Sequence, residues 1–171
     1  MRSRVRAGGH AVHPILIVFP LGLLTTAVGF DVLWLITDRA SFAFTAAHVI
    51  AAGVLLGVVT SATGWLDWLL AVPVGTRARR VGLAHGFVNT AVLVLFGISW
   101  LLRAGAPGWD ASPLALVLAW AGLAVAGFGG WLGGELVERM GISVEEGAHP
   151  DAPSSLGKRP VTATATVPAE R

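Results

Sequence analysis

The sequence contains no cysteine and no tyrosine, and it carries few charged side chains. Without cysteine, the chain cannot form a disulfide framework, hold an iron–sulfur cluster through thiolates or use thiol chemistry. Charged residues make up 13% of the 171 residues, whereas soluble domains carry about 25%. Hydrophobic residues make up 54% of the chain, and the mean hydropathy is +0.72. The composition therefore predicts an integral membrane protein.

The net charge is only +2, yet the sequence pI is about 10.4. Nearly all of the basic residues are arginines, and no cysteine or tyrosine titrates between histidine and lysine. The high pI reflects this sparse titration curve rather than a basic surface for nucleic acid. We therefore expect the partner to be a lipid bilayer and not nucleic acid.

Four apolar runs are each long enough to cross about 30 Å of hydrocarbon, which takes roughly 20 helical residues. They are residues 14–37, 42–70, 81–102 and 113–137. Because the connections between them are short, consecutive helices should be antiparallel neighbours. The sequence thus predicts an all-α membrane protein, with residues 13–142 forming an up-down-up-down bundle of four transmembrane helices.

The arginines gather on one side of the predicted bundle. That side carries Arg2, Arg4, Arg6, Arg77, Arg79, Arg80 and Arg139, and the other side only Arg39 and Arg103. By the positive-inside rule, both termini are predicted to be cytoplasmic. Residues 1–12 then form a basic cytoplasmic arm. Residues 143–171, which are rich in proline, alanine and threonine, are predicted to be a disordered cytoplasmic tail.

Small residues recur every four positions in the second and fourth predicted helices. The two ladders are Gly53-Gly57-Ser61 and Gly122-Ala126-Gly130-Gly134. Such ladders let helix backbones approach closely. They favour close packing inside the bundle, and a homodimer is the alternative.

Ionisable residues inside the membrane cost about 2.5–3.5 kcal/mol each at mid-helix and are candidates for function. Asp31 and His48 lie at equal distances from the centre of the first turn, so they should have similar depth on adjacent helices. Asp67 and His85 are placed in the same way about the second loop. The pattern predicts two carboxylate–histidine pairs, one toward each membrane face.

Helical periodicity predicts a second grouping. Asp31 follows His13 by 18 residues, which is five full turns, so both project from one face of the first helix. His85 and Asn89 are four residues apart and share a face of the third helix. The first and third helices lie on a diagonal of the bundle, so His13 and His85 should point into the core from opposite sides, with Glu135 nearby.

Each of these groups also has a purely structural interpretation. Buried polar pairs in membranes fix helix register, at about 0.6 kcal/mol each. Asp67 can instead meet the loop arginines Arg77, Arg79 and Arg80, which otherwise set the topology.

Several short motifs together resemble a family of bacterial membrane proteins called domain of unknown function 2231, over about residues 12–144. The motifs are His13-Pro14 with Phe19-Pro20, Thr63-Gly64-Trp65-Leu66-Asp67-Trp68, Gly75-Thr76-Arg77-Ala78-Arg79-Arg80, His85 with Asn89, and Gly129-Gly130-Trp131-Leu132-Gly133-Gly134-Glu135-Leu136-Val137. The resemblance implies a multi-pass membrane protein without an assigned activity. Some relatives carry a fused Rieske-type iron–sulfur domain, which implies a link to electron transfer. Because the 171 residues contain no cysteine, we do not expect them to include such a domain. The resemblance also implies a location in the inner membrane of a bacterium.

The sharpest hypothesis is a redox-associated membrane subunit that binds haem b. His13 and His85 would be its axial ligands, and Asn89 and Glu135 would supply hydrogen bonds around them. Such a subunit would meet a redox partner protein or a second copy of the chain.

Two other hypotheses stay open. A proton relay or proton-coupled transporter would use Asp31 and His48 on one side, and Asp67 and Glu135 with the two core histidines on the other. A structural partner subunit would use the histidines only to fix helix register. A hydrolase is disfavoured, because no serine lies in a nucleophile context and no HExxH zinc motif occurs. We predict no catalytic residues and at most an electron-transfer component.

Overall fold

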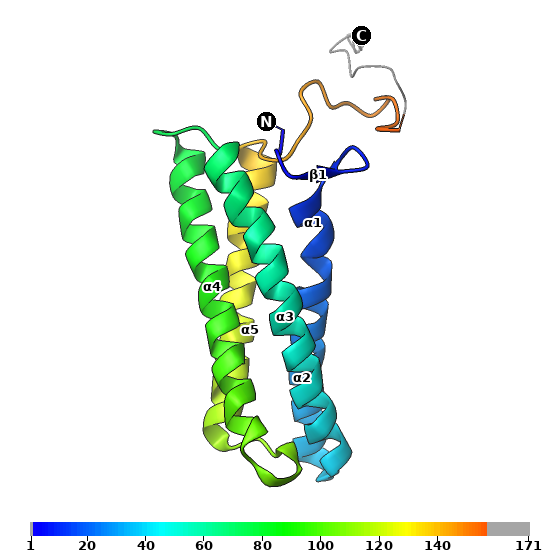
Figure 1. The fold of residues 1–171 in the computed structure, drawn as a ribbon, viewed down its shortest axis with the longest axis vertical. Coiled ribbons are helices and arrows are strands. Elements are labelled where there is room, and N and C mark those ends of the chain that lie inside the picture. The colour runs from blue at the N-terminus through cyan, green and yellow to red at the C-terminus, as the bar shows by residue number, and fades with distance from the viewer. Residues whose placement is uncertain (1, 157–171) are drawn as a thin grey trace, which may run out of the picture.

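The computed structural model describes residues 2–156, and within them four helices are long and apolar enough to cross a membrane. The helices run along a common axis as a bundle, and the N-terminal residues and the segment after the last helix lie at the same end (Figure 1). This confirms the predicted all-α fold with four candidate spans. Which end faces the cytoplasm stays a prediction.

The helices begin and end close to the predicted bounds. The elements are β1 (Arg6–Ala7), β2 (His10–Ala11), α1 (Val12–Leu16), α2 (Val18–Thr37), α3 (Ala40–Leu70), α4 (Arg77–Ala104), η1 (Pro107–Trp109), α5 (Pro113–Gly134) and η2 (Glu135–Arg139). β1 and β2 pair as a short antiparallel hairpin. The helix α4 is longer at both ends than the predicted run 81–102, and this difference moves Arg103 from a loop into a helix.

Local sequence explains the helix ends. Thr76 caps α4 by accepting a hydrogen bond from the Arg79 backbone N–H at 3.1 Å, and Ser112 caps α5 in the same way from Ala115 at 3.2 Å. The first span is divided at Ile17, between α1 and α2. Pro20 lies three residues later and has no N–H to donate to the carbonyl of Leu16, so the regular helix weakens there.

The bundle is built from two helical hairpins. α2 packs along most of α3, α4 packs along most of α5, and α3 packs against α4, whereas α2 and α5 touch only sparsely. The small-residue ladders contribute to this packing. A Cβ added at Gly53 would lie 2.7 Å from Leu24, and one at Gly122 would lie 2.8 Å from Phe96. These two glycines therefore leave the space that Leu24 and Phe96 fill, whereas a Cβ added at Gly130 or Gly134 would meet nothing within 4 Å.

Buried positions recur between the two hairpins. The buried residues Pro20, Leu24 and Asp31 of α2 are each followed 72 residues later by a buried residue of α4, namely Val92, Phe96 and Arg103. In α3, the buried residues Ala46, Ile50, Gly53, Gly57 and Thr60 are each followed 69 residues later by a buried residue of α5, namely Ala115, Ala119, Gly122, Ala126 and Gly129. The two hairpins thus bury equivalent faces.

Candidate functional site

Asp31 of α2 and Arg103 of α4 form an ion pair inside the bundle. The guanidinium donates from Nη1 to Oδ1 at 2.6 Å and from Nη2 to Oδ2 at 2.7 Å. Both side chains are 0% exposed. Ser99 donates to the carbonyl of Ala115 at 2.7 Å and accepts from Nε of Arg103 at 3.4 Å.

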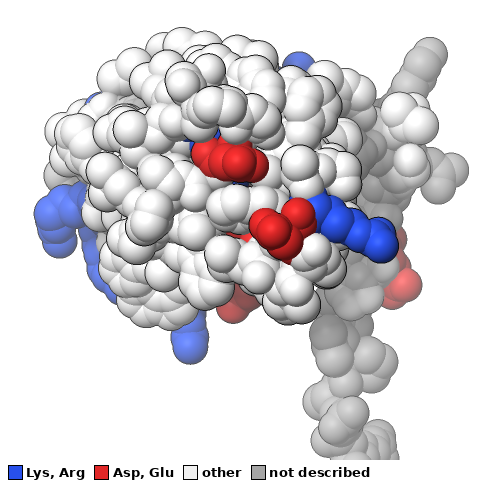
Figure 2. All heavy atoms as spheres, turned by 90° about the horizontal axis from the view of Figure 1, so that it is seen from below, with Lys and Arg blue, Asp and Glu red and all other residues white. Residues whose placement is uncertain are grey.

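Seen from the end away from the termini, the surface is mostly uncharged, with isolated acidic and basic side chains (Figure 2).

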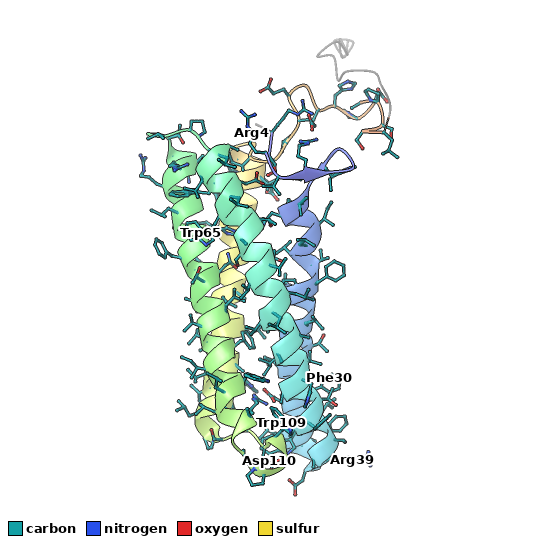
Figure 3. All side chains as sticks on the ribbon, viewed as in Figure 1. Arg4, Phe30, Arg39, Trp65, Trp109 and Asp110 are labelled. Carbon is teal, nitrogen blue, oxygen red and sulfur yellow. The ribbon has the colours of Figure 1, made fainter. Side chains whose placement is uncertain are left out.

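The predicted pairing of Asp31 with His48 is therefore wrong, because Arg103 binds both carboxylate oxygens of Asp31. His48 is exposed, and its Nδ1 bonds to the carbonyl of Phe44 on its own helix at 2.8 Å. Its ring stacks on Phe44 and contacts Trp109, with centroids 4.0 and 4.8 Å away. Trp109 lies at the end of the bundle opposite the N-terminal arm (Figure 3). His48 thus belongs to an aromatic cluster at that end.

His13, near the start of α1, is held by the second helix of its own hairpin. Its Nδ1 is 3.0 Å from the carbonyl oxygen of Thr60. Gly64 lies one turn further along α3, and a Cβ there would be 2.9 Å from the imidazole. Glycine at this position is therefore what lets the ring reach the carbonyl. Because a carbonyl only accepts, Nδ1 carries the proton of this hydrogen bond, and in the neutral ring Nε2 keeps its lone pair.

His85 of α4 is held in the same way. Its Nδ1 is 3.0 Å from the carbonyl of Gly129 on α5, and a Cβ at Gly133, one turn further along, would lie 3.2 Å from the ring. Asn89 donates to the backbone carbonyl of His85 at 2.8 Å, and its amide nitrogen lies 3.3 Å from both ring nitrogens. Asn89 thus covers the imidazole from its own helix.

The two imidazoles face each other across the bundle. Their ring centroids are 6.4 Å apart, and the ring planes are nearly perpendicular, at 85°. Both rings are half-buried. The structure therefore brings together the two histidines that helical periodicity placed on the bundle diagonal.

A cavity of about 90 Å³ adjoins the His85 side of this pair. It is lined by all four long helices, through Ile17, Pro20, Leu21, Leu24, Gly57, Ser61, His85, Asn89, Val92, Leu93, Ala126, Gly129 and Gly130. The lining is mainly apolar, and Ser61, His85 and Asn89 supply its polar side chains. Ile17 and Asn89, Leu21 and Leu93, and Ser61 and Gly130 occupy equivalent positions of the two hairpins.

Asp67 binds the N-terminal arm and does not pair with His85. This corrects the second of the two expected carboxylate–histidine pairs. Its carboxylate accepts from Ser3 Oγ at 2.5 Å and from the backbone N–H groups of Arg4 and Val5 at 2.8 and 3.0 Å. Asp67 as a whole residue is 9% exposed. Arg4 and Trp65 both lie at this end of the bundle (Figure 3). The β1–β2 hairpin that follows leads directly into α1, so Asp67 fixes the segment that precedes His13.

Glu135 also lies away from the imidazoles. It accepts from Arg77 at 3.0 Å and is 4.0 Å from Arg139, so it joins the start of α4 to the end of α5. In the described residues its hydrogen bond and ion pairs are with these arginines, and not with the imidazoles as the sequence led us to expect. Arg79 packs over the Trp68 ring at 3.7 Å and bonds the carbonyls of Trp68 and Val72. These arginines therefore stabilise the loop between the hairpins.

Glu145 ties the segment after η2 to the N-terminal arm. It is 2.7 Å from Arg2 and also pairs with Arg6. Partial desolvation raises the pKa of Glu145, but the hydrogen bond from Arg6 and the charges of Arg2 and Arg6 outweigh it and hold that pKa below its ordinary value. Disorder is predicted for residues 143–171, and of these residues 157–171 lie outside the described part of the chain.

Acidification is expected to loosen this contact. Because the folded-state pKa of Glu145 is lowered, its stabilising contribution is present above the ordinary pKa and is lost as the pH falls through the lower, folded-state pKa. Hydrogen-exchange protection of residues 2–7 and 143–148, corrected for intrinsic rates, should fall a few-fold as the pH is lowered below the ordinary pKa of a glutamate. Glu145→Gln should remove this pH dependence and Glu146→Gln should keep it. Equal pH dependence in wild type and Glu145→Gln would contradict the assignment.

In the core, the imidazoles of His13 and His85 are the side chains suited to bind a metal. Among residues 2–156, no group of three or more histidine, cysteine, aspartate or glutamate side chains is arranged to hold a metal ion. A cofactor that brings its own equatorial donors is therefore better suited to this pair than a bare ion.

One family model matches the chain, over residues 9–146, and its description is "Predicted membrane protein (DUF2231)". No curated protein and no solved structure matches the chain. The matched residues include both imidazoles, the Asp31–Arg103 pair and Asp67.

Proposed function

The chain belongs to the DUF2231 family of predicted membrane proteins, and on that premise we propose that it is a haem-binding, redox-associated subunit of a bacterial inner membrane. His13 and His85 are the proposed axial ligands. The observation that carries this proposal is the shared tethering of the two rings, in which each Nδ1 bonds to a backbone carbonyl of the neighbouring helix. Histidines that bind metals are commonly oriented in this way, with the other nitrogen free for the metal.

The separation of the two rings also suits one iron atom. Two metal–nitrogen bonds of about 2 Å, together with the distance of roughly 1.1 Å from each nitrogen to its ring centre, give a centroid separation of about 6.2 Å. The observed value is 6.4 Å. A porphyrin supplies four further nitrogens and leaves two axial positions, which matches a site with two protein ligands.

The space beside the rings fits the macrocycle only in part. The cavity of about 90 Å³ is well below the roughly 300–1,000 Å³ of typical ligand pockets. It is apolar and lies between the hairpins, where α2 and α5 touch sparsely. The donor set therefore fits haem, whereas room for the ring requires the hairpins to separate along the α2–α5 side.

A bis-imidazole haem, when bound, supplies reversible one-electron chemistry without an open coordination position. The chain's own residues orient the two imidazoles through the carbonyls of Thr60 and Gly129. Pro20, Leu24 and Val92 line the cavity beside His85 with apolar surface. In such a site Asn89, whose amide lies 3.3 Å from Nε2 of His85, would turn away from that nitrogen and keep its bond to the backbone.

A proton relay is the second candidate, and the cavity beside His85 is the observation in its favour. Its volume of about 90 Å³ is enough for a few water molecules at about 30 Å³ each, with Ser61 and Asn89 as polar partners. At the opposite end of the bundle, Asp31 does not provide the second proton-binding group that the relay needs, because Arg103 donates to both of its carboxylate oxygens. The haem proposal uses the observed tethering of both histidines and is therefore preferred.

Haem titration of the detergent-purified chain tests the proposal. We expect wild type to develop a Soret band that saturates at one haem per chain, and His13→Ala or His85→Ala to weaken binding at least 10-fold, because one of the two ligand bonds is lost. His48→Ala is the matched control, since His48 lies outside the core. A correctly folded protein that binds no haem, or binds it equally well in all three variants, would contradict the proposal. Proton flux in liposomes without a chromophore would favour the relay.

A further inference from the structure

The two hairpins repeat one another in their contacts as well as in their buried positions. In the first hairpin, Leu24 of α2 fills the space over Gly53 of α3. In the second, Phe96 of α4 fills the space over Gly122 of α5. Phe96 follows Leu24 by 72 residues and Gly122 follows Gly53 by 69. The same pair of positions therefore builds the helix contact in each hairpin.

The histidine sites repeat in the same register. His13 bonds the Thr60 carbonyl beside Gly64, and His85 bonds the Gly129 carbonyl beside Gly133. The offsets are again 72 residues between the histidines and 69 between the glycines. The match extends over most of both hairpins, from the histidines near one end to Asp31 and Arg103 near the other.

Equivalent residues meet where the two hairpins face each other. His13 faces its equivalent His85, and Asp31 bonds its equivalent Arg103. In an up-down-up-down bundle the first and third helices run parallel. Equivalent parallel helices that meet on a diagonal are related by a pseudo-two-fold axis along the bundle, as in parallel repeats of membrane transporters.

The charge pair is the point at which the two repeats must differ. On a two-fold axis, two identical hairpins would bring Asp31 against a second Asp31, or Arg103 against a second Arg103. Like charges without a partner are strongly unfavourable in a buried site. Unlike hairpins bring the two residues into the bidentate pair that the structure contains. The Asp31–Arg103 pair therefore disfavours the association of two identical hairpins and stabilises the association of the two different hairpins in the observed fold.

We infer that the bundle is a fused pair of equivalent hairpins, and that Asp31 and Arg103 select the pairing of the first hairpin with the second. The partner surface of each hairpin is thus the other hairpin, and not the same hairpin of another chain. The inference does not rest on haem binding. It rests on the repeat and on the buried pair.

The repeat also identifies which residues support each charge. Ser99, one turn before Arg103, accepts from the guanidinium and donates to the carbonyl of Ala115. The equivalent residue before Asp31 is Ala27, which is fully buried, and the equivalent of Ala115 is Ala46. A serine at position 27 would therefore face the Ala46 carbonyl as Ser99 faces that of Ala115. The charges should be exchangeable when the serine moves with the arginine.

Charge exchange in the full chain tests the inference. Arg103→Asp reproduces the Asp–Asp contact of like hairpins and Asp31→Arg the Arg–Arg contact. Each should lower the thermal unfolding midpoint by about 10 °C or more, or give aggregated protein. The exchange Asp31→Arg/Arg103→Asp should recover most of this loss. The fourfold variant that adds Ala27→Ser and Ser99→Ala should unfold within about 3 °C of wild type.

The fourfold variant decides the outcome. Recovery by the fourfold exchange, beyond that of the charge exchange alone, supports interchangeable half-sites. An exchange variant as unstable as the single variants would overturn the inference, because the pair would then depend on its local surroundings and not on the repeat. Exchange variants that are stable but elute as dimers, while wild type is monomeric, would also overturn the selection of the second hairpin as partner.

Discussion

Replacing Arg103 by methionine is expected to destabilise the protein by about 3–5 kcal/mol, because it leaves a buried carboxylate without its partner. Asp31 is 0% exposed, and in the described structure its hydrogen bonds come from Arg103. The substitution leaves an unpaired carboxyl group in an apolar surrounding. The midpoint of thermal unfolding in detergent should fall by about 10 °C.

The double variant Asp31→Leu/Arg103→Met measures the net contribution of the ion pair to the free energy of unfolding. The single variant measures instead the destabilisation caused by leaving one charge without its partner. Well-packed apolar residues often replace a buried ion pair at little cost, so we expect the double variant to lie within about 1–2 kcal/mol of wild type. Arg39→Met is the matched control, since Arg39 is exposed at the same end of the bundle (Figure 3). A single Arg103→Met variant as stable as wild type would show that the pair is not buried as described.

Replacing Asp67 by alanine is expected to release the N-terminal arm. The carboxylate accepts three hydrogen bonds from Ser3, Arg4 and Val5, and it is almost fully buried. Hydrogen bonds to a charged group contribute about 1.5–3 kcal/mol each when a partner is removed. Losing about 3 kcal/mol of docking free energy corresponds to roughly 100-fold more frequent opening of the arm.

Hydrogen exchange of the peptide that contains residues 2–11 measures this opening. Its protection should fall about 100-fold in Asp67→Ala and less in Asp67→Asn, which keeps one acceptor oxygen toward the backbone N–H groups. Asp38→Ala, at the opposite end of the bundle, should leave the arm protected. Unchanged protection in Asp67→Ala would mean that the arm is held by other contacts, chiefly those of Arg2 and Arg6 with Glu145.

Hydropathy and helical periodicity were sufficient to predict the fold and one of the two pairs in the core, that of His13 with His85. Long apolar runs with short loops leave few topologies other than an antiparallel bundle. The 18-residue spacing of His13 and Asp31 placed both on the inner face of the first span, and the structure brings His13 and Asp31 to facing partners on α4. Periodicity predicts which face of a helix is inside, and here it succeeded.

The partners of the carboxylates could not be predicted from depth alone. Asp31 and His48 have similar depth, but rotation of α3 about its axis points His48 outward. Arg103 was assigned to a loop, although it follows His85 by the same 18 residues that separate Asp31 from His13. That repeated spacing was the available signal. The partners of Asp67 lie in an arm of irregular conformation, for which the sequence offers no periodic pattern.

The haem content and axial ligation of the full chain, purified in detergent after expression with ample haem, test the central claim most directly. The proposed function predicts one low-spin, six-coordinate haem per chain in wild type and in His48→Ala. It predicts loss of that species in His13→Ala and in His85→Ala. Folded wild-type protein without haem, or a low-spin haem that persists in the His13→Ala/His85→Ala double variant, would contradict it.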